Sequence, residues 1–139
     1  MRLGMGTLVA LAMFADSNPM VAQATTVFKG RPEIKVVERA LNRDAGPVPQ
    51  EQAPNLECII SRIGDRYYWA TRENKEMVAI ESGAFITFIA IEGAGYIKVI
   101  KPEMKGVASL MGDAEARFDY VEHLTIGLSS VTYFGKRRD

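Results

Sequence analysis

Short runs of β-branched and aromatic residues, separated by turn residues, fill the chain from residue 56 onward. The runs at 56–63 and 66–72 flank Gly64 and Asp65, a pair that suits a two-residue hairpin turn with glycine first. A second hairpin is expected from residues 84–101, since the glycines at 93 and 95 allow the positive φ values of a turn. A short strand is also predicted at 77–80.

The last predicted strand is long and covers residues 118–134. Apolar residues of one parity are expected to face the core, because successive strand residues point to opposite faces; they are Tyr120, Leu124, Ile126, Leu128 and Phe134. Gly127 falls in the middle, where it predicts a bulge or a bend.

Residues 32–43 favour a short helix, because Ile34, Val37 and Leu41 form one apolar stripe and Pro32 suits the first helical position. A strand is the competing interpretation, since Ile34, Val36 and Val37 are β-branched. The pattern therefore predicts an α+β or mainly β fold. Its antiparallel sheet would have about five or six strands, with one N-terminal helix packed on it.

The first 24 residues have the layout of a secretory signal peptide. Arg2 precedes an apolar run of about a dozen residues, too short to span a bilayer, and Ala22 and Ala24 occupy the −3 and −1 positions of a cleavage site. Residues 25–139 would then be a single globular domain containing a proline-rich linker at 45–55. We expect a periplasmic or secreted protein without a membrane span after removal of the signal.

Charge and motifs exclude several classes of function. The 17 basic and 17 acidic side chains cancel, which gives no general attraction to nucleic acid. No nucleotide loop, zincin helix or redox pair occurs, so neither a cofactor nor a metal is predicted. The single cysteine, Cys58, is expected to be buried and inert; if it were exposed, it could form a disulfide between chains.

His123 is the only histidine and therefore the natural candidate for acid–base catalysis. Its neighbour Glu122 is a candidate carboxylate, but adjacent strand residues point to opposite faces. The carboxylate would then have to come from a neighbouring strand. The alternative is a hydrogen-bonded histidine at the sheet surface, and the sequence favours that interpretation.

The hairpin strand at 66–72 carries the most suggestive surface. If Tyr67 and Trp69 face the core, Arg66, Tyr68 and Arg72 form an exposed aromatic and basic stripe beside Asn74 and Lys75. Such a stripe can stack on planar groups or bind anions. Cross-strand packing, with arginine stems covering tyrosine rings, is the simpler alternative.

Three functions follow as hypotheses. The leading one is a small exported, non-catalytic binding domain that uses this hairpin surface for a glycan or protein partner. The second is a small exported hydrolase or acid–base enzyme that uses His123 with a carboxylate. The third is a subunit of a homo-oligomer that pairs through open edges of the strands at 84–91 and 118–134.

Overall fold

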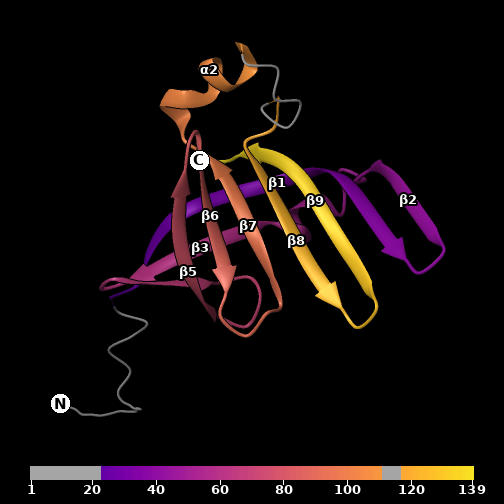
Figure 1. Ribbon diagram of the computed structural model, residues 1–139, viewed down its shortest axis with the longest axis horizontal. Coiled ribbons are helices and arrows are strands. Elements are labelled where there is room, and N and C mark those ends of the chain that lie inside the picture. The colour runs from indigo at the N-terminus through magenta and orange to yellow at the C-terminus, as the bar shows by residue number, and fades with distance from the viewer. Residues whose placement is uncertain (1–22, 111–116) are drawn as a thin grey trace.

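The computed structural model describes residues 23–110 and 117–139. In this part of the chain the strands form a closed antiparallel barrel of eight strands with one extra strand beside it (Figure 1). In chain order, the elements are β1 (Thr25–Arg39), β2 (Asn42–Pro47), η1 (Ala53–Leu56), β3 (Cys58–Ile63), β4 (Arg66–Trp69), β5 (Lys75–Ser82), β6 (Phe85–Ala90), β7 (Gly95–Ile100), η2 (Pro102–Met104), α2 (Lys105–Leu110), β8 (Tyr120–Ile126) and β9 (Ser129–Arg137).

The long first strand closes the barrel. The start of β1 pairs with β3 at residues 25–30, and residues 30–38 of β1 pair with β9. The remaining strands follow one another around the barrel as hairpins. The extra strand, β2, pairs with residues 34–39 of β1 on the edge opposite β9.

The predicted small sheet with a packed N-terminal helix is therefore wrong. Residues 32–39 continue β1, and residues 42–43 begin β2. As a strand, this segment forms backbone hydrogen bonds with β2 on one edge and β9 on the other. This tertiary pairing outweighs the helical spacing of its apolar residues. Pro32, which cannot donate a backbone hydrogen bond, lies where the register between β1 and β9 shifts.

The predicted single strand at 118–134 is instead the hairpin β8–β9. Gly127 has a φ of +59° and lies in the two-residue turn that joins Ile126 to Ser129. The reversal changes which residues face the core, because Tyr133 now lies opposite Glu122 inside the barrel. Ile126 and Leu128 are exposed, at 61% and 96% of their surface.

The other two hairpins are confirmed as β3–β4 and β6–β7, with positive φ at Gly64, Gly93 and Gly95. Both strands of the β6–β7 pair, and both of the β8–β9 pair, have neighbours on each side. They therefore offer no open edge of the kind expected for homo-oligomer pairing. The stretch at 45–55 ends β2 and forms η1, where Val48 and Ala53 pack beside Tyr133.

Side chains fill much of the barrel interior. The buried cluster consists of Phe28, Cys58, Ile60, Trp69, Met77, Phe88, Ala90, Ile97, Val99 and Tyr120. Cys58 is fully buried, as predicted. The Tyr120 ring packs against Gly30 of β1 and Gly135 of β9, which leave space for it because they have no side chains.

Gly30→Ala is expected to lower the free energy of unfolding by about 1–3 kcal/mol, the usual cost of overfilling a packed core. An added Cβ would lie 2.4 Å from Cε1 of Tyr120, which is itself buried. Gly46→Ala is the matched control, because a Cβ there meets no atom within 4 Å. Urea unfolding of both variants measures the difference, and equal midpoints would contradict this packing.

Candidate functional site

The predicted hairpin surface is only partly formed. Tyr67 and Trp69 face the interior, and Arg66 and Tyr68 lie on the outer face of β4. The Arg66 side chain is 65% exposed and lies 3.8 Å from the Glu76 carboxylate. These outer residues remain accessible to a partner.

Arg72 turns away from that surface. Its side chain is 27% exposed, and its Nε lies 3.5 Å from Oε2 of Glu122, which is fully buried. The remaining two residues of the predicted stripe lie in and beside the β4–β5 turn: Asn74 has a φ of 53°, and Lys75 lies 3.5 Å from Glu73. The five predicted binding residues therefore do not converge on one surface.

The two candidate catalytic residues are also separated. Glu122 points into the barrel and His123 points outward, as strand alternation requires. The His123 ring stacks on Tyr96 with 5.1 Å between ring centroids, and its Nδ1 lies 2.9 Å from Oγ1 of Thr132. No neighbouring strand brings a carboxylate to His123 among the contacts of the described residues. The arrangement matches that of a surface histidine held by its neighbours.

Glu122 instead forms part of a buried polar cluster. The indole Nε1 of Trp69 donates a 2.7 Å hydrogen bond to Oε2, and Oε1 has no hydrogen-bond partner. Burial raises the pKa of the Glu122 carboxyl above its ordinary value, although the Arg72 guanidinium and the Trp69 N–H oppose this effect. Burial beside Glu122 also raises the pKa of the Cys58 thiol, which makes the thiolate scarce.

A cavity of about 420 Å³ lies in the mouth of the barrel. Figure 1 shows α2 and the C-terminus at this end of the barrel. Residues from β1, β4, β5, β6, β7 and β9 line it together with the start of η2: Val27, Phe28, Tyr67, Glu81, Ile86, Phe88, Val99, Ile100, Lys101, Pro102, Glu103 and Arg137. The walls are mainly apolar and aromatic, and the charged residues lie at the rim.

The aromatic walls of the cavity are held in place by ring contacts. Tyr67 and Phe88 meet edge to face with 5.2 Å between centroids, and Phe28 meets Tyr120 in the same way at 5.3 Å. At the rim, Lys101 donates a 3.2 Å hydrogen bond to Glu81. The Arg137 guanidinium lies 4.9 Å from the centre of the Phe28 ring.

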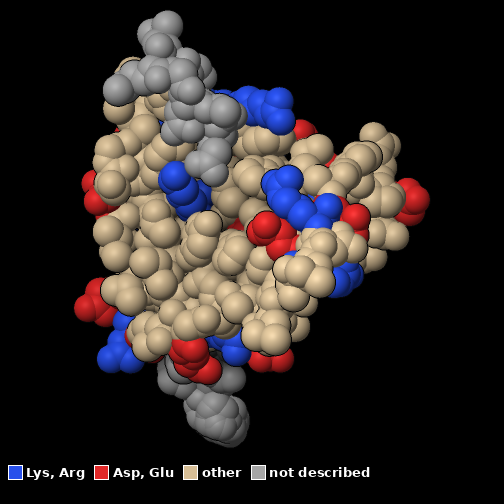
Figure 2. Space-filling view, turned by 45° about the vertical axis from the view of Figure 1, so that its right-hand side comes forward, with Lys and Arg blue, Asp and Glu red and all other residues tan. Residues whose placement is uncertain are grey.

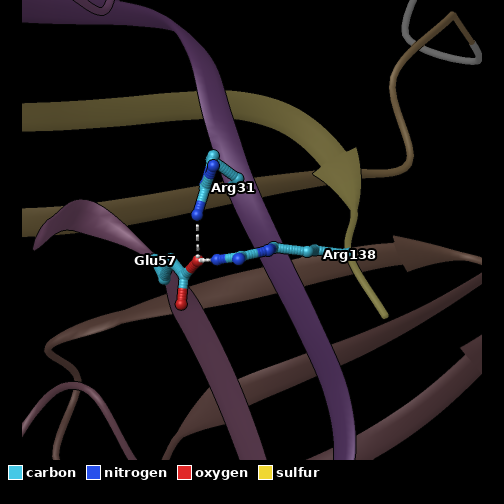
Figure 3. Close-up of polar contacts among 3 residues, drawn as sticks. All are labelled: Arg31, Glu57 and Arg138. Carbon is cyan, nitrogen blue, oxygen red and sulfur yellow. Dashed lines mark hydrogen bonds and ion pairs between the residues drawn. The ribbon is translucent and has the colours of Figure 1, made fainter. Parts of the chain in front are cut away.

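A second concavity, about 720 Å³ in volume, adjoins the first at Arg137. We call it the basic groove, lined by Arg31, Pro32, Glu33, Val48, Gln50, Ala53, Lys136, Arg137 and Arg138. Beside it, Arg31 and Arg138 both point toward Glu57 (Figure 3). Burial would raise the pKa of the Glu57 carboxyl, but the hydrogen bonds from Arg31 and Arg138 outweigh it and lower the pKa.

A third concavity, of about 760 Å³, lies on the outer surface of β6 and β7 under Ala108 of α2. It is lined by outward side chains such as Phe85 and Tyr96, and only strands β5 to β7 contribute to it. On the face shown in Figure 2, acidic and basic side chains are mixed and separated by uncharged areas. By contrast, six strands contribute to the walls of the barrel-mouth cavity, which makes it the better candidate for a ligand site.

Neither a metal centre nor a membrane-spanning helix is found in the described part of the chain. No three His, Cys, Asp or Glu side chains among residues 23–110 and 117–139 are placed to hold a metal ion. No helix in these ranges has the length and apolar character needed to cross a membrane. The signal-peptide prediction falls almost entirely on residues 1–22, which lie outside the described residues.

Comparisons with protein-family models, curated proteins and solved structures found no match. The candidate site therefore rests on the geometry of this chain. Sequence reasoning missed Phe28 and Arg137 at the barrel mouth. Their only signals in the sequence are an isolated aromatic residue before the main β region and a basic C-terminal stretch.

Proposed function

We propose that this chain is an exported, non-catalytic binding protein that holds a small molecule with an apolar body in the mouth of its barrel. The observation that carries the proposal is the cavity of about 420 Å³ with aromatic walls and a charged rim. Ligand sites are typically concave and mostly apolar, with volumes of about 300–1,000 Å³ and a few polar groups that orient the ligand. An eight-stranded barrel is wide enough to be filled by its own side chains or to hold one small ligand.

This proposal keeps the binding function inferred from the sequence but places it at another surface. The hairpin expected to bind a partner on its outer face contributes Tyr67 to the cavity wall. Arg72 pairs with Glu122 in the interior and is not available to an external partner. The catalytic hypothesis has less support, because His123 and Glu122 lie on opposite faces of β8.

Export is the second part of the proposal, and the intact mass of the protein from its native host tests it. Removal of residues 1–24 would leave the whole of β1, which begins at Thr25. The mass is measured without reducing agent, and we expect it to correspond to a species that starts at Thr25. A full-length species would contradict export and would leave the cavity proposal to its own test.

The chain-length dependence of binding tests the cavity directly. Straight-chain alkanoates titrated into the protein should bind more tightly with length, by about fourfold per methylene group, because each buried CH₂ contributes about 0.8 kcal/mol. The increase should stop when the chain fills the cavity. Calorimetry measures this series, and affinities that do not depend on length would contradict an apolar site.

Ile86→Trp is expected to weaken decanoate binding by at least about tenfold, which is about 1.4 kcal/mol. Ile86 is half-buried in the cavity wall, so an indole there occupies the space of the ligand. Ile80→Trp is the matched control, because Ile80 lies on the neighbouring strand, outside the cavity lining, and is 50% exposed. Equal affinity in two folded variants would show that decanoate binds elsewhere.

A further inference from the structure

We infer that the ligand is an anionic amphiphile, whose negatively charged group is recognised by Arg137 and the basic groove. This inference rests on the proposed binding function and specifies the chemical class of its ligand. The apolar body would occupy the barrel mouth, and a carboxylate or a similar anionic group would extend past the rim.

Arg137 connects the two concavities. It belongs to the lining of both the cavity and the basic groove, so one arginine side chain at most separates them. Its contact with the Phe28 ring places the guanidinium over an apolar wall of the cavity. None of the ion pairs found in the described ranges uses this guanidinium. A ligand that fills the cavity therefore meets an available cation at the rim.

The basic groove adds further positive charge on the same side of the mouth. Four of its lining residues are cationic and only one, Glu33, is acidic; the cations are Arg31, Lys136, Arg137 and Arg138. Arginine side chains bind carboxylates and phosphates well because their planar donors match two oxygens at once. An anionic group would be attracted to this part of the rim.

Glu57 holds two of these arginine side chains in place but neutralises only part of the positive charge. Its Oε2 accepts a 3.0 Å hydrogen bond from Arg31 and a second one from Arg138, so one carboxylate serves two guanidinium groups (Figure 3). The Nε of Arg31 is buried and has no hydrogen-bond partner. By contrast, the rim cation Lys101 is paired with Glu81. Of the two cations that line the cavity, Arg137 is therefore the one outside the ion pairs found in the described ranges.

Two ligands with the same chain length, one with an anionic and one with an uncharged head group, test the inference. Decanoate and 1-decanol share the chain length, and both are titrated below their aggregation limits into the wild-type protein and the Arg137→Gln variant. We expect the wild type to bind decanoate about fivefold more tightly than decanol, as for a partly exposed ion pair. Arg137→Gln should weaken decanoate binding more than decanol binding and so remove most of this preference. Arg66→Gln is the control on the outer face of β4.

The outcomes separate the two proposals. If both ligands bind equally well and Ile86→Trp blocks both, the cavity binds apolar molecules and the anionic preference is wrong. If neither ligand binds the folded protein, the proposed function itself fails. If Arg137→Gln weakens both ligands equally, Arg137 shapes the cavity wall and does not recognise charge, which also overturns the inference.

Discussion

Trp69→Ala is expected to lower the free energy of unfolding by about 3–5 kcal/mol, the usual cost of truncating a large core aromatic residue. Trp69 is fully buried at the centre of the barrel interior. The substitution leaves a void among packed side chains and removes the N–H that donates to Glu122. Urea unfolding monitored by circular dichroism measures the loss, because the indole would no longer serve as a fluorescent reporter.

Trp69→Phe separates packing from hydrogen bonding at this position. The phenyl ring restores much of the buried volume, but Oε2 of Glu122 still loses its 2.7 Å hydrogen bond. Trp69→Phe should therefore lower the free energy of unfolding by less than Trp69→Ala, by about 1–3 kcal/mol, the cost of a buried acceptor left without its donor. A Phe variant as unstable as the Ala variant would mean that the hydrogen bond, and not the filled volume, dominates at Trp69.

Arg72→Met is expected to cost about 3 kcal/mol at neutral pH, because it leaves a buried carboxylate without its cation. Removing one partner of a buried ion pair typically costs about 3–5 kcal/mol. The lower end applies, since the Arg72 side chain is 27% exposed and Glu122 keeps its hydrogen bond from Trp69. Arg66→Met is the matched control: its pair with Glu76 is exposed, and its loss should cost less than about 1 kcal/mol.

The cost of Arg72→Met should depend on pH. The pKa of Glu122 is raised in the folded protein, so protonation of this carboxyl stabilises the folded state. That contribution to the free energy of unfolding is fully present below the pKa of Glu122 in the unfolded chain. It is lost as pH rises through the pKa of Glu122 in the folded protein. Without the guanidinium, which opposes this rise, the folded-state pKa moves higher. The difference in free energy of unfolding between wild type and Arg72→Met should therefore be small in acid and increase toward neutral pH.

A double variant tests whether Arg72 and Glu122 interact directly. Adding Glu122→Gln to Arg72→Met removes the buried charge, and we expect it to recover a large part of the lost stability and to flatten its pH dependence. Unfolding midpoints of the single and double variants across pH measure both effects. A double variant as unstable as the sum of the two single variants would contradict direct coupling between Arg72 and Glu122.

Local patterns predicted the β3–β4 and β6–β7 hairpins, because the glycines of their turns give a local signal. Gly64, Gly93 and Gly95 take the positive φ values for which glycine is suited. The inward orientation of Tyr67 and Trp69 follows from strand alternation once the hairpin is known. Cys58 is buried for the same reason, since it lies two residues before Ile60 and points to the same, inward face of β3. In these segments the predicted strands and turns lie where the fold has them, although β4 ends at Trp69 and not at residue 72.

The closure of the barrel could not be predicted in this way. Residues 34–38 have β-branched side chains at helical spacing, and only pairing with β2 and β9 decides for a strand. β2 follows β1 directly, but β9 lies near the C-terminal end of the chain, so no local window contains both partners. The candidate site has the same origin, because Phe28, Tyr67 and Arg137 meet only when β1 and β9 close the barrel.

Arg72 shows how one turn changes a functional prediction. Its parity with Arg66 and Tyr68 suggested a shared outer face, but β4 ends at Trp69 and the following turn rotates the side chain inward. The buried carboxylate that attracts it lies 50 positions later in the chain. A stripe inferred from strand alternation is valid only as far as the strand continues.

Contacts between a bound ligand and the aromatic walls of the barrel-mouth cavity test the proposed binding site most directly. With the protein saturated by decanoate, intermolecular nuclear Overhauser effects should connect the chain methylenes to the rings of Phe28, Tyr67 and Phe88. Such contacts would place the ligand inside the barrel mouth. Contacts confined to outward residues such as Ile80 and Ile89, or none at saturation, would contradict the proposed site.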